Sequence, residues 1–220
     1  MDRDHGALAE HDACVVPDQV YANLTEGRPR DALRAQSRRD WEAFLRERAR
    51  ELRPGGQVVV VGGTSRSDGS SGAEGLFELA NAQLGAMVAD GLLRRSEYQN
   101  IFYPTWNRTL QEVMEPFEGG AFAGALAVEE HLEHTSWDAA SYPQYEQDGD
   151  AAAFAEAYVP FVRAVTAPSF FRWLEADRSE AERAMIEDAF YAGLKRRIAA
   201  EPAKATCHWH TVGLRLRKAG

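Results

Sequence analysis

Cysteine and histidine side chains occur together near the C-terminal end, in the run Cys207-His208-Trp209-His210. Thiolate sulfur and imidazole nitrogen are good zinc ligands. In an extended strand, however, successive side chains point to opposite faces, so Cys207 would point away from both histidines. Two histidines need a third ligand, and the sequence offers no obvious one. A packed or surface strand is therefore the favoured interpretation, and a metal site is the alternative.

A second polar cluster contains His131 and His134 together with Glu129, Glu130 and Glu133. At helical spacing these side chains could also bind a metal, but a run of acids more often faces water. We therefore predict no metal site in this chain.

Other catalytic patterns are missing from the sequence. The serine-nucleophile motif Gly-x-Ser-x-Gly does not occur, and Ser70 and Ser71 belong to a polar loop. The carboxylates are too many and too scattered to select a glycosidase pair. The Gly-x-Gly-x-x-Gly turn of doubly wound nucleotide-binding folds is absent as well. Taken alone, the residues indicate a soluble α/β domain with an aromatic loop.

Composition limits the class of protein. The chain has 220 residues, of which 45% are hydrophobic and 27% charged, and its formal net charge is -9. Such a chain can bury a real core, and its acidity disfavours a nucleic-acid partner. The longest aliphatic run, residues 58–61, is too short to span a bilayer, and the first residues lack the apolar core of a secretory signal. We therefore expect a cytoplasmic protein without membrane contact.

The elements that must position these residues alternate between helices and strands. An apolar stripe at helical spacing predicts a helix over residues 31–53, which ends at Pro54-Gly55-Gly56. Four successive valines then predict a strand over residues 57–63 that is buried on both faces, as in a parallel sheet. Alternating apolar residues over 206–218 predict a final strand with His208, His210, Val212, Leu214 and Leu216 on one face.

Most of the remaining chain has helical character. Capping boxes at Thr109–Glu112 and Ser179–Glu182 each predict the start of a helix. The patterns also predict a helix over 73–93, a strand over 122–128, a long connection over 134–150, and a helix over 154–174 interrupted by Pro160 and Pro168.

This order predicts an α/β fold with a partial sheet and a largely helical insert. We assign residues 1–63 and 176–220 to the α/β core and residues 64–175 to a helical substrate-binding cap. A strand at 57–63 that lacks a neighbour would leave an exposed apolar edge, so we expect a homodimer or poor solubility.

Several segments resemble, in order, the carboxyl methyltransferases of the salicylate, jasmonate and caffeine-synthase type, the SABATH family. Residues 40–56 resemble the family's FLxxRAxELxPGG, residues 87–93 its MVxEGLI, and residues 104–113 its PxYxPSxxEV. Weaker likenesses follow at 120–122, 163–168 and 186–190. The order and spacing of these strings across residues 40–218 carry the resemblance.

The resemblance implies a Rossmann-like fold and transfer of a methyl group from S-adenosylmethionine (SAM) to the carboxylate of a small organic acid. Because a carboxylate is already nucleophilic, such an enzyme mainly has to align its two substrates and exclude water. Matching the family position by position implies substrate contacts at Leu76, Phe77, Trp106, Val162, Val165 and either His208 or Trp209, of which we choose Trp209.

The sequence also departs from the family. Where some members have magnesium ligands, residues 99–102 read Gln-Asn-Ile-Phe, so we expect no magnesium. Residues 7–14 lack the family's substrate-facing tryptophan. The glycine-rich SAM turn is missing, so we expect that the chain lacks the N-terminal SAM-binding half. The sequence identifies no cofactor-binding residues, which stay unknown. The alternative is a non-catalytic, truncated domain that binds a small acid or a partner subunit.

Overall fold

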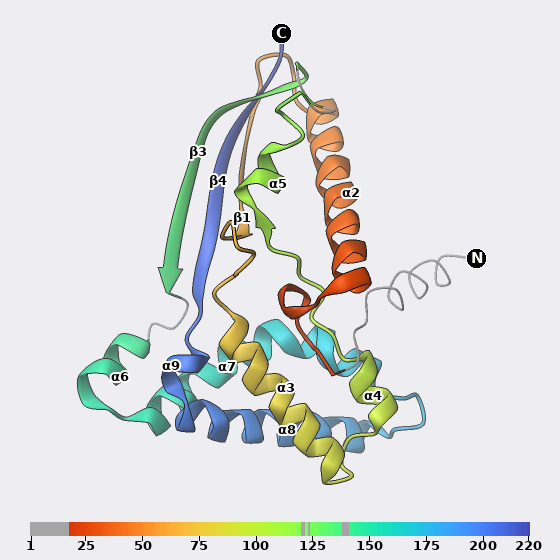
Figure 1. Ribbon diagram of the computed structural model, residues 1–220, viewed down its shortest axis with the longest axis vertical. Coiled ribbons are helices and arrows are strands. Elements are labelled where there is room, and N and C mark those ends of the chain that lie inside the picture. The colour runs from red at the N-terminus through yellow and green to blue at the C-terminus, as the bar shows by residue number, and fades with distance from the viewer. Residues whose placement is uncertain (1–17, 120–121, 123, 138–140) are drawn as a thin grey trace. The chain divides into compact units, whose positions relative to one another are not determined.

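The computed structural model describes residues 18–119, 122, 124–137 and 141–220, and the chain divides into two compact units. The positions 7–14 discussed above lie outside the described residues. A helical unit comprises residues 1–30, 73–105 and 137–207. A sheet unit comprises residues 31–72, 106–136 and 208–220. Each is described by itself, with the elements labelled in Figure 1. The predicted division into an α/β core and a substrate-binding cap stays a prediction.

A four-stranded sheet in the order β2-β1-β4-β3 forms the sheet unit. Its strands are β1 (Gln57–Ser65), β2 (Arg108–Thr109), β3 (Leu126–Trp137) and β4 (His208–Lys218). β1 and β4 pair antiparallel from Gln57↔Arg217 to Thr64↔His210. β2 pairs parallel with β1 at Thr64 and Ser65 only. The sheet is therefore mixed, and the predicted α/β fold class is confirmed.

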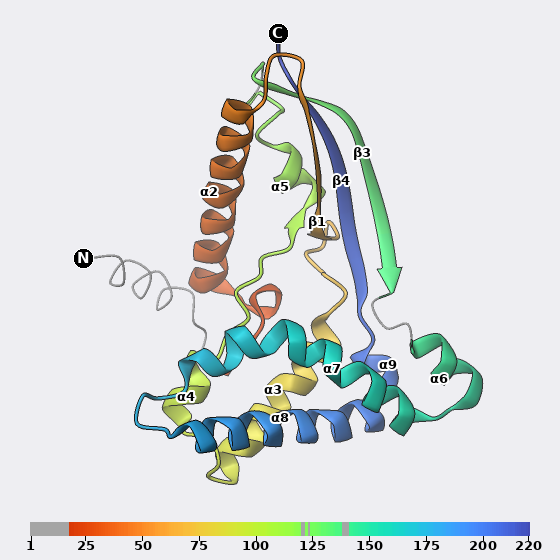
Figure 2. The ribbon, with the colours of Figure 1, turned by 180° about the vertical axis from the view of Figure 1, so that it is seen from behind.

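Helix α2 (Gly27–Glu51) and the short helix α5 (Leu110–Met114) lie along one side of this sheet in both ribbon views (Figures 1 and 2). Trp41 and Leu45 of α2 pack in one apolar cluster with Val212, Leu214 and Leu216 of β4. Burial of a side chain such as Leu45 stabilises the unit by roughly 1.5–3 kcal/mol. The predicted alternation of the last strand is confirmed, because its apolar residues face this core.

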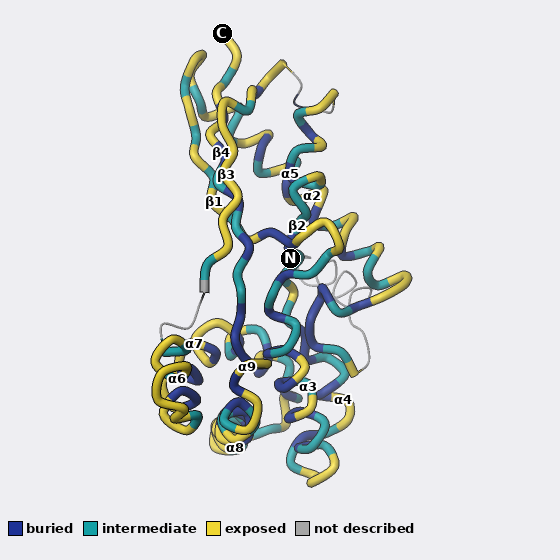
Figure 3. Tube along the Cα trace, turned by 60° about the vertical axis from the view of Figure 1, so that its left-hand side comes forward, coloured by how far each residue is buried: buried dark blue, intermediate teal, exposed yellow. Residues whose placement is uncertain are grey.

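The expectation that residues 57–63 are buried on both faces is wrong. Val58 and Val60 pack on the core, but Val59 and Val61 are 67% and 73% exposed. Alternate residues of a strand point to opposite faces, so the described part of the chain covers only one face of β1 at these positions. Figure 3 shows the exposed segments along the strands in yellow.

Six helices and two 3-10 turns make up the described part of the helical unit. They are α3 (Glu74–Ala89), α4 (Arg95–Asn100), α6 (Tyr142–Asp148), α7 (Ala151–Phe170), α8 (Glu180–Ala200), α9 (Pro202–Ala205), η1 (Ala22–Leu24) and η2 (Phe171–Trp173). α7 and α8 run side by side, and α3 packs against α8 (Figure 2). Phe170, Phe190 and Tyr191 meet edge to face in the buried core between α7, η2 and α8.

Both predicted capping boxes are confirmed, at Thr109–Glu112 and at Ser179–Glu182. The predicted interruption at Pro160 and Pro168 is wrong, because α7 is one helix with both prolines inside. Packing of its apolar face against α8 compensates for the missing amide donors. The predicted connection over 134–150 is also wrong, since it contains the end of β3 and α6. None of the described helices combines the length and hydrophobicity that crossing a bilayer requires.

Candidate functional site

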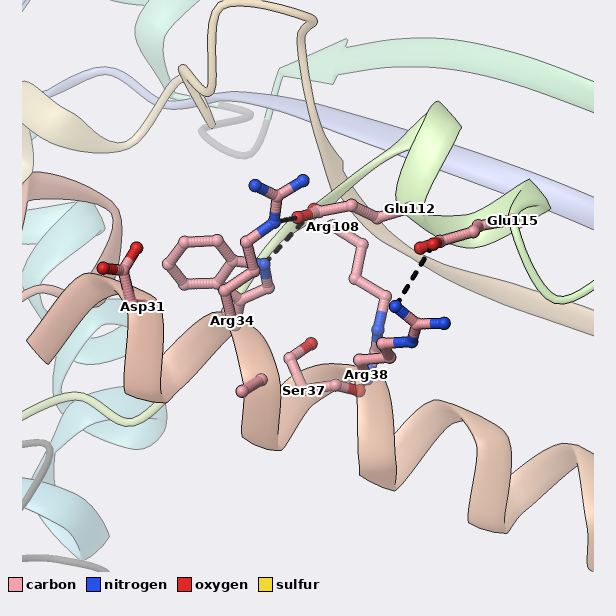
Figure 4. A pocket seen from close by; sticks show the side chains of 9 residues that line it. Asp31, Arg34, Ser37, Arg38, Arg108, Glu112 and Glu115 are labelled. Atoms are coloured by element: carbon pink, nitrogen blue, oxygen red, sulfur yellow. Dashed lines mark hydrogen bonds and ion pairs between the residues drawn. The ribbon is translucent and has the colours of Figure 1, made fainter. Parts of the chain in front are cut away.

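A pocket of about 270 Å³ opens in the sheet unit beside α2 (Figure 4). One wall is a stretch of α2, and the other is the segment that contains β2 and α5. The lining residues are Asp31, Arg34, Ala35, Ser37 and Arg38 on the first wall and Trp106, Arg108, Glu112 and Glu115 on the second.

Glu112 holds the second wall together. Its Oε2 accepts hydrogen bonds from the backbone N–H of Thr109 at 2.9 Å and from Trp106 Nε1 at 3.3 Å. Its Oε1 accepts from Arg34 Nε at 2.5 Å. The capping box that begins α5 therefore also orients the Trp106 indole. Trp106, which the family resemblance implied, lines the pocket.

Arg108 is a half-buried cation at the inner end of the pocket. Its Nη2 donates to the Ser37 carbonyl at 2.5 Å, and its guanidinium lies 5.5 Å from the Trp41 ring centroid. Among the described residues its Nε has no hydrogen-bond partner, and no carboxylate pairs with it. Burial lowers the pKa of Arg108, and the charges of Asp40 and Glu112 only oppose that effect at a distance. The cation is incompletely satisfied.

Ser37 lies next to Arg108 and is only 6% exposed. Its Oγ has no hydrogen-bond partner among the described residues. A buried hydroxyl without a partner costs free energy, on the order of 1–3 kcal/mol. Figure 4 shows this hydroxyl pointing from α2 toward the pocket, between Arg34 and Arg38. Neither Ser37 nor Arg108 was predicted from the sequence. The signal for Ser37 was its four-residue spacing from Trp41 on the apolar stripe of α2.

Four of the other five charged side chains of the pocket form two ion pairs. Arg34 pairs with Glu112, and Arg38 lies 3.2 Å from Glu115. The arginines of both pairs are exposed, so each pair contributes roughly 0–1 kcal/mol to stability. Both pairs reduce the negative charge of the pocket's two glutamates, although Arg38 also pairs with Glu42.

A separate aromatic cluster surrounds Phe77 in the helical unit. Its ring stacks on Tyr21, with centroids 4.1 Å apart, and on Tyr103, with centroids 5.0 Å apart. The Tyr103 amide donates to the Val20 carbonyl at 2.7 Å, which ties the two tyrosine segments together. Phe77 is 2% exposed, so its environment is apolar and aromatic. The sequence showed Tyr103 in an aromatic loop but showed no period around Tyr21.

The predicted substrate residues are divided between the units. Leu76 and Phe77 are neighbours on α3, and Val162 is buried on α7 of the same unit, whereas Val165 is 37% exposed. Trp106 and Trp209 belong to the sheet unit, where Trp209 is half-buried on β4. Their roles as substrate contacts stay predictions.

The two histidine clusters show no metal geometry in the described part of the chain. There, no three His, Cys, Asp or Glu side chains gather closely enough to hold a metal ion. His210 Nδ1 lies 2.8 Å from Thr135 Oγ1. Cys207 is buried and its sulfur accepts a hydrogen bond from the Tyr158 hydroxyl at 3.3 Å. His131 and His134 lie exposed on β3.

Glycines around β1 serve contacts within the chain. A Cβ at Gly72, whose φ is +87°, would lie 2.1 Å from the His208 carbonyl oxygen. A Cβ at Gly63 would lie 3.1 Å from Asn107 Oδ1. At both positions the space that a Cβ would take is occupied by the chain itself, so these glycines allow close packing within the chain. These residues do not fit the glycine-rich cradle of a SAM site.

Comparison with known proteins defines the class. The sequence profile of the SAM dependent carboxyl methyltransferases matches residues 6–218, so the chain belongs to this family. The resemblance found in the sequence is confirmed.

Two relatives show how much of a family member is present. Methyltransferase LUC1 from Fusarium sp is 29% identical over 146 residues, which are 64% of this chain and 40% of that protein. A solved loganic acid methyltransferase with SAH has the same fold, with a TM-score of 0.68 at 17% identity. That match covers 92% of this chain and 53% of the other. The chain thus spans about half or less of these relatives.

Proposed function

We propose that this chain takes part in the transfer of a methyl group from SAM to the carboxylate of a small organic acid. The observation that carries the proposal is the family match over residues 6–218. In this family SAM supplies the activated methyl group. The protein's task is to align acceptor and donor in a dry, largely apolar pocket. We assign the acceptor contacts to Leu76, Phe77, Trp106, Val162, Val165 and Trp209, in a cytoplasmic protein.

We further propose that SAM is held mainly by residues outside these 220. The absence of a glycine-rich turn from the sequence supports this. The close packing of Gly63 and Gly72 against other residues of the same chain also supports it. The proposed cap, residues 64–175, and the proposed core, residues 1–63 and 176–220, would then supply the contacts to the methyl acceptor.

Isothermal titration of the chain with SAM tests this division. We expect no binding in the micromolar range, since the chain has no recognisable cradle. Micromolar binding would instead place the cofactor site within these residues. Reading the genomic DNA upstream of Met1 gives a second test, because we expect an acidic strand end and a Gly-x-Gly turn there. Unrelated sequence at that place would contradict the division.

Methyl transfer itself is tested on the polypeptide extended by that upstream sequence, with labelled SAM and a panel of small acids. We expect transfer to one or more acids, and a raised KM in Phe77→Leu and Trp106→Phe with a smaller effect on kcat. Phe161→Leu is the matched control, because Phe161 is 39% exposed on α7. An extended polypeptide that binds SAM but methylates no acid would overturn the proposed activity.

A second candidate function, binding of another protein chain, rests on β1. Residues 57–63 pair with β4 on one edge, and no strand pairs with their other edge in the described part of the chain. The outward Val59 and Val61 are largely exposed. An open edge with exposed apolar groups favours association, so we propose a homodimer. Light scattering after size-exclusion chromatography tests this, and a monodisperse, cooperatively melting monomer would contradict it.

A further inference from the structure

The inner end of the pocket beside α2 has binding capacity that the chain itself does not use. Arg108 Nε and Ser37 Oγ are both buried and both lack a hydrogen-bond partner among the described residues. The bond from Arg108 Nη2 to the Ser37 carbonyl, at 2.5 Å, places the two side chains next to each other. Buried charges and hydroxyls in proteins are normally paired, so an incomplete pair that faces a cavity marks a place for a ligand.

The charges around the cavity select an anion at this end. Glu112 pairs with Arg34, and Glu115 shares Arg38 with Glu42 of α2. Among the described residues, Arg108 is the lining arginine that forms no ion pair. Asp31 is exposed to water and lies at the far end of the pocket in Figure 4. An arginine fork matches the planar oxygens of a carboxylate or the oxygens of a phosphate.

The size of the cavity and the Trp106 indole select the rest of the ligand. A volume of about 270 Å³ suits a compact molecule with one ring or a short chain. The indole lines the cavity and is oriented by its hydrogen bond to Glu112. Aromatic rings prefer offset-stacked or edge-to-face contacts with such a surface.

We propose that Arg108 and Ser37 form a binding site for a small organic oxyanion, a carboxylate or phosphate ester whose apolar body packs against Trp106. A guanidinium neutralises an oxyanion and weakens it as a nucleophile. The site therefore anchors its ligand and does not present it for methylation. It goes beyond the proposed methyl transfer. Trp106 is also a proposed acceptor contact, but Arg108 and Ser37 are not, so variants of these two residues test binding here separately from transfer.

The test is a titration followed by the ¹H–¹⁵N signal of the Trp106 indole, assigned with Trp106→Phe, with the Trp173 indole as internal reference. The probes are benzoate, phenyl phosphate, neutral benzamide and inorganic phosphate. We expect benzoate or phenyl phosphate to shift the Trp106 signal along a saturable curve, and benzamide and inorganic phosphate to bind at least about tenfold more weakly. The tighter of the two aryl probes identifies the oxyanion as carboxylate or phosphate.

Variants of the whole chain locate the site. Arg108→Gln should weaken the tighter probe about 10- to 100-fold, and Ser37→Ala about tenfold, because each loses a hydrogen bond to a charged group. Arg39→Gln is the matched control, since Arg39 is exposed on the same helix and bonds to Gln36 outside the pocket. It should change affinity less than about twofold. Thermal unfolding checks that each variant folds. Ser37→Ala keeps the test decisive if Arg108→Gln does not fold, because it removes only a hydroxyl without a partner.

Three results would overturn the proposal. The first is no saturation with either aryl anion up to about 10 mM, because so high a Kd corresponds to a smaller binding free energy than a specific site should provide. The second is benzamide or inorganic phosphate binding as tightly as the aryl anions. The third is a folded Ser37→Ala variant with unchanged affinity.

Discussion

Two half-buried arginines, one in each unit, differ in how many of their hydrogen bonds and charges are paired. In the helical unit Arg178 donates from Nε and Nη2 to the two carboxylate oxygens of Glu97, at 2.9 and 2.8 Å. Glu97 is fully buried and also accepts from the amides of Arg94 and Glu175. In the sheet unit, the contacts of Arg108 with described residues are the Ser37 carbonyl and the face of Trp41.

The difference separates a structural network from a binding one. Burial opposes the charge of Glu97, yet the hydrogen bonds from Arg178 and from the two amides outweigh it and hold the pKa of Glu97 below its usual range. Burial lowers the pKa of Arg108, and the charges of Asp40 and Glu112 oppose this shift without outweighing it. A hydrogen-bond network in which every group is paired stabilises the fold. A network with unpaired groups can still bind a ligand through them.

Breaking the complete network should have the largest effect. Arg178→Met leaves the Glu97 carboxylate buried without its cation, and we expect a loss of about 3–5 kcal/mol in the free energy of unfolding. Urea unfolding at neutral pH measures it. Arg196→Met, an exposed change on α8, is the control and should cost less than about 0.5 kcal/mol. A loss for Arg178→Met no larger than the control's would show that the network is not structural.

Acid should weaken the same network in a defined direction. Because the pKa of Glu97 is lower in the folded than in the unfolded protein, its contribution is complete above the unfolded pKa, about 4.3. It is lost as the pH falls through the folded-state pKa. We therefore expect the gap in urea midpoint between wild type and Glu97→Gln to narrow on acidification from neutral pH. A gap that does not change with pH would contradict the ionised pair.

Removal of one hydroxyl group in each unit, by Tyr191→Phe and Ser37→Ala, should have smaller effects on the free energy of unfolding. Tyr191 OH lies 2.8 Å from Thr166 Oγ1 in the buried core, and burial raises the pKa of Tyr191 to about 12. Tyr191→Phe should cost about 1 kcal/mol because it removes a satisfied hydrogen bond. Ser37→Ala should cost less than about 0.5 kcal/mol, or stabilise the fold, because its hydroxyl has no partner in the described part of the chain. Urea unfolding of both variants measures these changes in the free energy of unfolding. A larger loss for Ser37→Ala than for Tyr191→Phe would contradict the expected order.

The smallest effect on stability should come from the open face of β1. Val61→Thr keeps shape and strand propensity at a position that is 73% exposed, so we expect a change within about 0.5 kcal/mol. Val60→Thr, on the face that packs on the core, should cost about 1–2 kcal/mol. Self-association measured by sedimentation should fall in Val61→Thr. Unchanged association would remove this face from the homodimer interface.

Local chemistry explains which parts of the fold were predictable. The capping boxes at Thr109 and Ser179 involve residues three positions apart, so the sequence is sufficient to locate these helix starts. The alternation along β4 was equally local. The continuous helix through Pro160 was not, because its stability depends on packing against α8.

The candidate site was predictable only in part. Trp106 was found through the family resemblance, and its position beside the pocket agrees with a binding role. Arg108, two residues later, was missed because an arginine in a loop is usually solvated. Its burial comes from Trp41 and Ser37, which are about seventy residues away in the chain.

The sequence by itself determined the family, the α/β class, the helix starts and the inward face of the last strand. These properties depend on residue types at short, regular spacing. Only the tertiary structure decided which face of β1 is covered and that Ser37 and Arg108 meet in one pocket, where Arg108 forms no ion pair with a described residue. Such properties depend on which distant segments pack together, and therefore on burial, which no local pattern specifies.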